Sequence, residues 1–233
     1  ITAKILKGID LNSENGFSHP YLNKHKSLKT LLIVMTPDRG SCGSLNTNLF
    51  KKMLEIENAE AQVVTVGKKA GVFAAKLGYD LLASFPMGNS IPDYSMVYQL
   101  KNIIDDEILH KRIGGVSVLY ADFVSLFTQT PIIKQLLPIA LYESDKNGTL
   151  GTSLFEPGRD ELLKELLPYY LEVQLYDALL QSFTSEQAAR MVAMQNAKNN
   201  ANDIAEYLNL VYNRSRQERI TNEILDLSNS KQT

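Results

Sequence analysis

The sequence predicts an α/β protein in which a Rossmann-like, mostly parallel sheet flanked by helices is joined to a very long C-terminal helix. Two observations predict this fold. Short, continuously apolar runs alternate with helical patterns between about residue 28 and residue 121, which is typical of parallel strands covered on both faces. From Pro168 to Leu227 the chain has no further Pro and no Gly, and the residues that dominate it favour helix.

Four strands and three helices are predicted in the first part of the chain. The strands are Leu28–Met35, Gln62–Val66, Asp80–Phe85 and Val116–Ala121. The helices are Leu45 to about Ala59, Gly67–Leu77 and Tyr94–Arg112.

The next segment is broken by prolines. Phe123–Tyr142 contains Pro131 and Pro138, so we expect a strand pair at the sheet edge, where a missing backbone N–H is tolerated. Residues 145–157 are predicted as a loop with a turn at Asn147-Gly148. Arg159–Leu167 is predicted as a short helix, and Pro168 as the first turn of a new helix or a kink between two.

Composition excludes several classes of protein. The net charge of −2 gives no electrostatic case for binding nucleic acid. The longest uninterrupted apolar stretch, Leu31 to Met35, is far too short to cross a bilayer, so no direct membrane insertion is predicted. A single cysteine excludes an internal disulfide, and no His/Asp/Glu cluster has the spacing of metal ligands.

The loop after the first strand, Asp38 to Gly43, lies where a Rossmann domain holds phosphate. It lacks both the G-x-G-x-x-G spacing and a Walker A motif, so no cofactor is predicted there. We expect Gly40 and Gly43 to allow a tight turn with positive φ, and Asp38 to cap local amides. A buried structural thiol is the favoured interpretation of Cys42, over a nucleophile at a helix N-terminus.

The long helix carries a seam of small and apolar residues spaced four, three, four, three and four apart, which is the repeat of a left-handed coiled coil. The seam consists of Ala197, Ala201, Ile204, Leu208, Val211 and Ser215. On the opposite side, at about 100° per residue, lie Asn213, Gln217, Thr221 and Ile224. Because Ile224 is apolar and lies on this side, we expect the outer face of the helix to contact a partner as well. The helix would span about 90 Å, against about 35 Å for its own domain.

These features together resemble the gamma subunit of F-type ATP synthase. The resemblance covers about residues 27 to 227 and rests on the run Thr36-x-Asp38-Arg39-Gly40-x-Cys42-Gly43-x-x-Asn46 and on two longer matches in the last helix. These matches are Ser185-Glu186-Gln187-Ala188-Ala189-Arg190-Met191-Val192-Ala193-Met194 and Tyr212-Asn213-Arg214-x-Arg216-Gln217-x-x-Ile220-Thr221-x-Glu223.

The resemblance implies a central rotor with no catalytic site of its own. It implies a foot domain over residues 27–158 that binds the epsilon (or delta-type) stalk subunit and the membrane-embedded ring. The helix over residues 159–233 would stand inside the ring of alpha and beta subunits, in an antiparallel coiled coil with an N-terminal helix of which residues 1–26 hold the tail and a linker. The family's contact with beta carries over onto Arg216, Gln217 and Thr221.

Absence of the chloroplast regulatory insertion favours a peripheral protein on the cytoplasmic side of a bacterial inner membrane, or on the matrix side of the mitochondrial inner membrane. Two alternatives from other classes remain open. One is a nucleotide-binding α/β enzyme that uses the Gly40–Gly43 loop and dimerises through the helix. The other is a homodimeric coiled-coil scaffold.

Overall fold

The computed structural model describes residues 19–22, 29–56, 61–139 and 159–229. Three of the predicted features, namely the tail of an N-terminal helix at Ile1–Lys7, the turn at Asn147-Gly148 and the last residues of the helix predicted to Ala59, lie outside the described residues.

One five-stranded sheet forms the centre of the foot, in the order β3-β2-β1-β4-β5. Its strands are β1 (Lys29–Met35), β2 (Ala61–Val66), β3 (Asp80–Phe85), β4 (Ile113–Phe123) and β5 (Gln129–Leu137). The first four run parallel, and β5 pairs antiparallel with β4. In the centre of the sheet Ile33 pairs with Val64 on one side and Val118 on the other. The prediction of a mostly parallel sheet is confirmed.

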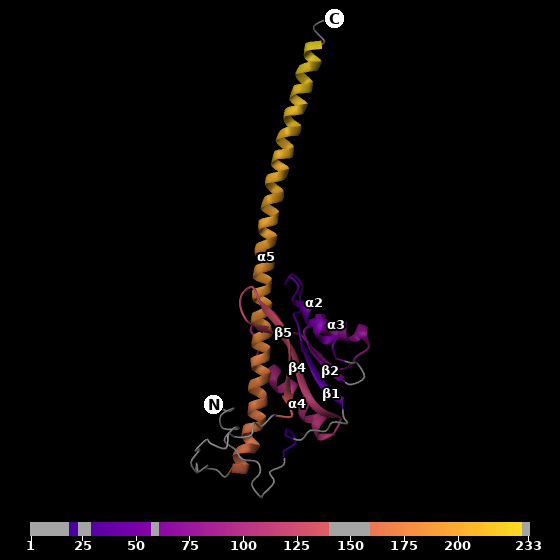
Figure 1. Ribbon diagram of the computed structural model, residues 1–233, viewed down its shortest axis with the longest axis vertical. Coiled ribbons are helices and arrows are strands. Elements are labelled where there is room, and N and C mark those ends of the chain that lie inside the picture. Colours follow the sequence, from indigo (N-terminus) through magenta and orange to yellow (C-terminus); the bar gives the residue numbers. More distant parts are fainter. Residues whose placement is uncertain (1–18, 23–28, 57–60, 140–158, 230–233) are drawn as a thin grey trace.

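Helices cover both faces of this sheet (Figure 1). Helices α2 (Leu45–Met53) and α3 (Lys68–Leu77) pack on one face, and α4 (Tyr94–Leu109) and the lower part of α5 (Arg159–Asn229) on the other. The side chains of β1 therefore alternate between two cores. Ile33 belongs to the core under α4 and α5, whereas Val34 belongs to the core under α2 and α3. Burial on both faces explains why β1 reads as a continuous apolar run.

The segment Phe123–Tyr142 was predicted to hold a strand pair, but its described part holds one new strand, β5. Its partner is β4, which runs on to Phe123 and is longer than predicted. Pro131 is accommodated because β5 is the outermost strand on its side, so only one of its edges needs a full ladder of hydrogen bonds.

The C-terminal helix is continuous, so the predicted short helix ending at Leu167 and the predicted new helix beginning at Pro168 are wrong, whereas a kink at Pro168 stays a prediction. Pro168 lacks the N–H that would donate within the helix, which costs about 1 kcal/mol of net hydrogen bonding. The buried leucines Leu163, Leu167, Leu171 and Leu175 keep an unbroken spacing of four across it. Each contributes about 1.5–3 kcal/mol of burial, so packing on the sheet outweighs the lost hydrogen bond.

Two helix ends also differ from the sequence prediction. Helix α2 ends at Met53, before the predicted Ala59, and α4 ends at Leu109, before the predicted Arg112. Lys111 has a φ of 52°, which is a left-handed conformation that a continuing α-helix does not allow.

Candidate functional site

The upper part of α5 projects away from the foot (Figure 1). Every residue from Met194 to Asp226 is exposed, and we name this segment the shaft. At 1.5 Å per residue its 33 residues span about 50 Å. No described residue of the chain covers this long helical segment. We interpret it as an interaction surface, because isolated helices in water are marginally stable without a packed face.

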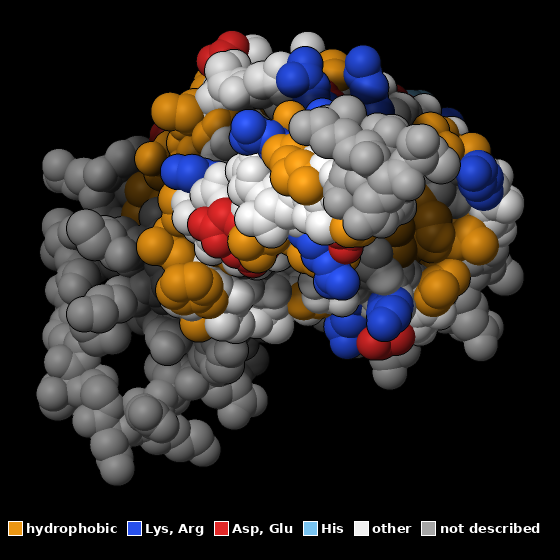
Figure 2. Space-filling model, turned by 90° about the horizontal axis from the view of Figure 1, so that it is seen from above, with side chains coloured by type: hydrophobic (Ala, Val, Ile, Leu, Met, Phe, Trp, Pro, Cys, Tyr) orange, Lys and Arg blue, Asp and Glu red, His pale blue; other side chains and the backbone are white. Residues whose placement is uncertain are grey.

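Apolar side chains lie on both sides of the shaft. The seam residues Ile204 and Leu208 are 59% and 58% exposed. Ile224, on the opposite side, is 61% exposed. Seen down the shaft, hydrophobic side chains lie on more than one side of the molecule, among acidic and basic ones (Figure 2). Since large apolar side chains on opposite sides of a helix cannot be covered by one partner helix, the shaft is shaped for contacts around its circumference.

The seam residues share one face of the helix as predicted. Ala197, Ala201, Ile204, Leu208, Val211 and Ser215 are all exposed, and no second helix lies against them in the described part of the chain. The antiparallel coiled coil therefore stays a prediction.

The five residues predicted to contact a surrounding ring lie near the tip of the shaft. Asn213, Arg216, Gln217, Thr221 and Ile224 are all exposed. The Thr221 hydroxyl donates to the Gln217 carbonyl at 2.9 Å. Neighbouring charges pair along the helix, with Arg214 Nε 3.1 Å from Glu218 Oε1. Within the described residues the side chains of Arg216 and Gln217 form no hydrogen bond or ion pair, so their donors and acceptors are available to a partner.

The lower part of α5 is anchored on the foot by buried and half-buried contacts. The Ser185 hydroxyl, fully buried, donates to the Ala121 carbonyl of β4 at 2.9 Å. Glu186 is buried next to it and pairs with Arg190, with 2.6 Å between Oε1 and Nη2. The run beginning at Ser185, which the sequence marks as one of its most distinctive, is thus the point where the shaft leaves the foot.

One carboxylate of the loop after β1 joins this loop to two other segments, the start of α3 and the loop after β3. Asp38 Oδ1 accepts from the backbone N–H of Lys68 at 2.8 Å and of Met87 at 3.2 Å, and Oδ2 accepts from that of Gly88 at 3.0 Å. Partial burial acts to raise the pKa of Asp38, but these donors outweigh it, and the pKa lies below the usual range of an aspartate. Asp38 caps backbone amides as predicted, but these amides are not local, since they lie 30, 49 and 50 residues further along the chain. Its carboxylate lies at the N-terminus of α3.

Positive φ angles in this loop occur at Ser41 (62°) and Gly43 (60°). The prediction holds for Gly43 but is wrong for Gly40, which is not among the residues with positive φ. The glycine with the tightest surroundings lies elsewhere. At Gly67, where φ is 109°, an added Cβ would lie 1.9 Å from the carbonyl oxygen of Thr36.

Cys42 is a buried structural thiol, as predicted. It is 2% exposed, and its sulfur accepts from Asn46 Nδ2 at 3.4 Å. Burial raises the pKa of the Cys42 thiol, so the unreactive protonated form dominates at neutral pH.

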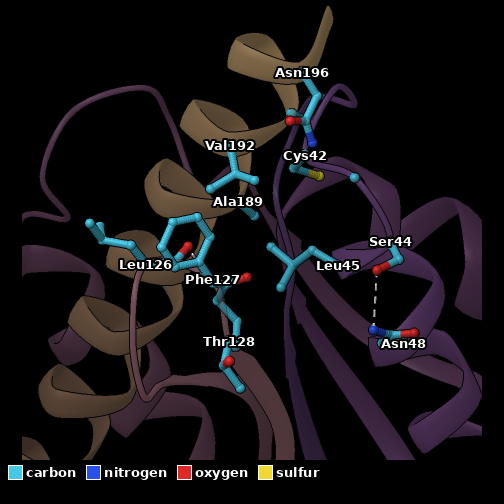
Figure 3. Close-up of a pocket in the computed structure, with 13 residues that line it drawn as sticks. Cys42, Ser44, Leu45, Asn48, Leu126, Phe127, Thr128, Ala189, Val192 and Asn196 are labelled. Carbon is cyan, nitrogen blue, oxygen red and sulfur yellow. Dashed lines mark hydrogen bonds between the residues drawn. The ribbon is translucent and has the colours of Figure 1, made fainter.

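A cavity of about 300 Å³ lies where the shaft meets the foot (Figure 3). Cys42 and Leu45 line it from one side, Ala189 and Val192 of α5 line it from behind, and Leu126 and Phe127 of the β4–β5 turn line it from the other side. Phe127 is 83% exposed. Sequence reasoning missed the turn residues, although the three apolar side chains Val124, Leu126 and Phe127 directly after a strand were a signal that could have found them.

Sequence reasoning also missed the cluster that joins α4 to α5. Glu172 lies 2.6 Å from Lys101 Nζ through Oε1, and its Oε2 accepts from the Tyr94 hydroxyl at 3.0 Å. Burial, followed by the hydrogen bond to Glu172, raises the pKa of Tyr94 to about 12. The sequence signal that pointed to this cluster was Glu172, an acidic residue directly after Leu171 in a row of leucines spaced four apart.

The described residues contain neither a metal cluster nor a membrane-spanning helix. No group of three or more His, Cys, Asp and Glu side chains could hold a metal ion. No helix in this part of the chain is long and apolar enough to cross a membrane.

Comparison with known proteins identifies the family. The ATP synthase family model matches residues 2–232. The ATP synthase gamma chain of Dehalococcoides mccartyi (strain BAV1) is 37% identical over 212 residues, which cover 90% of this chain and 74% of the relative. That of Legionella pneumophila (strain Corby) is 34% identical over 220 residues, covering 91% and 76%.

Solved structures share the fold. A chain of the Euglena gracilis mitochondrial ATP synthase in a structure of OSCP, F1 and the c-ring matches with a TM-score of 0.67, 19% identity, and coverage of 98% of this chain and 82% of that one. A chain of the Tetrahymena thermophila central stalk and c-ring matches with a TM-score of 0.58, 20% identity, and coverage of 84% and 94%. With the matching gamma chains, the foot and the projecting helix show that this chain belongs to the ATP synthase gamma chain family, the central rotor subunits of that enzyme.

Proposed function

We propose that this chain couples proton flow through a membrane ring to ATP synthesis or hydrolysis by rotating, without catalytic chemistry of its own. The observation that carries the proposal is the shaft, 33 exposed residues with apolar side chains on opposite sides. A rigid helix of about 50 Å that is fixed to a folded foot can transmit rotation from one end to the other. Its partners are the alpha and beta subunits around the shaft, and the epsilon or delta-type subunit and the membrane-embedded ring at the foot.

The contacts of the first loop support a non-catalytic role. The Asp38 carboxylate of this loop accepts from Lys68 N, and the Thr36 hydroxyl accepts from Ala70 N at 3.0 Å. Both side chains are therefore used to hold the N-terminus of α3. The negative charge of Asp38 would also repel a phosphate bound at this loop.

We assign different partners to the two sides of the shaft. The seam, rich in small residues, suits close packing of a second helix in an antiparallel coiled coil. Asn213, Gln217, Thr221 and Ile224, with Arg216 at their edge, suit a wider bearing made by the ring. Amide and guanidinium groups there can form and exchange hydrogen bonds as the shaft turns, since the side chains of Asn213, Arg216 and Gln217 have no partner within the described residues.

The location follows from the partners. We place the chain at the membrane surface as a peripheral subunit, on the cytoplasmic side of a bacterial inner membrane. Its matching gamma chains from Dehalococcoides mccartyi and Legionella pneumophila are bacterial, which supports this side over the mitochondrial matrix.

The test uses the assembled complex. We expect alpha and beta subunits to co-purify with the chain, and the double variant Gln217→Ala/Thr221→Ala to lower proton-driven ATP synthesis about tenfold, as expected when several hydrogen bonds worth about 1 kcal/mol each are removed together. The matched control is Thr184→Ala/Gln187→Ala. Both control residues are exposed on α5 beside the foot, and Thr184 donates to the Leu180 carbonyl at 2.8 Å just as Thr221 donates to that of Gln217. If the two variants synthesise ATP at equal rates, the proposed contact of Gln217 and Thr221 with the ring is wrong.

A further inference from the structure

A rotor needs its shaft to keep a fixed angle relative to its foot, and the apolar stripe of α5 does not fix that angle well. The stripe contains Leu163, Leu167, Leu171, Leu175 and Leu179, all at most 2% exposed. Burial of this kind has no preferred direction, so the helix can roll by a small angle and keep most of its apolar contact. Hydrogen bonds have strict angular limits and resist such a roll.

Polar contacts flank the stripe on both sides. At about 100° per residue, Glu172 lies about 90° to one side of the centre of the stripe and Gln181 about 90° to the other. Glu172 contacts α4, through Lys101 and Tyr94. Gln181 Oε1 accepts from the backbone N–H of Phe123, at the end of β4, at 3.4 Å.

The contacts on the Glu172 side are well built. The side chains of Lys101 and Glu172 are only 20% and 12% exposed, and each carboxylate oxygen of Glu172 has its own donor. A partly desolvated ion pair of this geometry is stronger and more directional than a surface pair.

On the opposite side the buried hydrogen bond from Ser185 to the Ala121 carbonyl supports the contact of Gln181. A roll of α5 in either direction therefore stretches the bonds of one flank and compresses those of the other. By contrast, the pairs along the exposed shaft, such as Arg214 with Glu218, join residues of the same helix and leave its angle to the foot free.

We propose that Glu172, held by Lys101 and Tyr94, acts with Gln181 and Ser185 as a rotational lock that fixes α5 to the foot and transmits torque between them. These are positioning residues, and the inference rests on the proposed rotor function. We therefore expect the Lys101–Glu172 ion pair to matter more for the fixed angle between α5 and the foot than for the free energy of unfolding. Replacing a buried ion pair by apolar residues of similar size commonly leaves stability unchanged or raises it.

The decisive variant is Lys101→Met/Glu172→Met, which removes the ion pair without leaving a lone buried charge. In the assembled complex, a bead attached through Val72→Cys on the exposed side of α3 reports the angle of the foot during pauses in rotation, when the ring holds the tip. Within the described residues four side-chain hydrogen bonds join α5 to the foot, and the variant loses the two of Glu172 and keeps those of Gln181 and Ser185. It also keeps the exposed ion pair of Lys134 with Asp177, 3.9 Å apart. If each of these hydrogen bonds contributes comparably to angular stiffness, the variance of the angle between foot and tip should rise about twofold. The urea midpoint of the isolated chain should stay at or above that of the wild type.

Leu171→Ala is the matched structural control, because it removes buried packing next to Glu172 and keeps all four bonds. It should lower the urea midpoint and leave the angular variance unchanged. The lock is wrong if the Lys101→Met/Glu172→Met variant keeps the wild-type variance, or if variance follows the loss of stability across both variants.

A second measurement separates failure of the lock from failure of the rotor function. Spin labels at Val72→Cys on the foot and Ile204→Cys on the shaft report their distance distribution in the free chain. We expect a broader distribution in Lys101→Met/Glu172→Met than in the wild type, and an equal width would overturn the lock. A wild-type chain that neither assembles nor rotates, yet shows this broadening, would contradict the rotor function and leave the lock standing.

Discussion

The division of α5 into a buried base and an exposed shaft makes a quantitative prediction for two leucines of one helix. Leu171 is 1% exposed and belongs to the core under α4 and α5, whereas Leu208 is 58% exposed. Leu171→Ala should lower the free energy of unfolding by ~3 kcal/mol, from lost transfer and a residual cavity. Leu208→Ala on the exposed shaft should change it by less than about 0.5 kcal/mol.

Urea unfolding of the isolated chain measures both variants. The chain has 11 tyrosines and no tryptophan, and only Tyr207 and Tyr212 lie on the shaft, so tyrosine fluorescence reports mainly the rest of the chain. With a slope of about 2 kcal/mol per molar urea, the midpoint of Leu171→Ala should fall by ~1.5 M. The midpoint of Leu208→Ala should stay within about 0.3 M of the wild type. An equally large shift for Leu208→Ala would mean that the shaft packs against its own foot, and the division proposed for α5 would be refuted.

Two further predictions concern the loops at the upper edge of the sheet. Gly67→Ala should lower the urea midpoint strongly, since backbone strain at positive φ costs about 1–3 kcal/mol and the new Cβ would collide with Thr36. The control Gly40→Ala places its Cβ in open space and should leave the midpoint nearly unchanged. Asp38 has a lowered folded pKa, so its stabilisation is present above the unfolded pKa of about 3.9 and is lost as pH falls through the folded pKa. Asp38→Asn should therefore be less stable than the wild type near neutral pH, with the difference shrinking in acid. A difference in midpoint that is the same at both pH values would contradict this assignment.

The sheet and its helices were predictable because their signals are local. β1, β2 and β3 are continuous apolar or β-rich runs bounded by turns, and each was found within one residue of its observed start. The long helix was visible from composition alone. Pro168 misled the prediction because local propensity gives a proline about 3 kcal/mol of penalty in a helix interior, while the compensating contacts of Leu163 and Leu171 with the sheet are distant in sequence.

The candidate site was predictable in part. The seam and the tip residues were found because a helix of known period orders its faces from sequence alone. Glu172 with Lys101 and Tyr94 could not be found in this way, since 71 and 78 residues separate the partners and only the packing of α4 on α5 brings them together. Ser41 has a positive φ and Gly40 does not. A glycine in the sequence therefore shows that an unusual backbone angle is possible nearby, but it does not show which residue adopts that angle.

The use of one helix for both core and shaft has a consequence for synthesis on the ribosome. All five strands leave the exit tunnel before the stretch from Leu163 to Leu179, which covers the second side of the sheet. Until that stretch emerges, side chains such as Ile33 and Val118 have no helix of α5 above them, and nascent chains at this stage expose apolar surface that favours aggregation. Pausing translation just before residue 163 should therefore make folding of the nascent chain more dependent on chaperones. A chain truncated after Ala193 should instead fold its foot without chaperones.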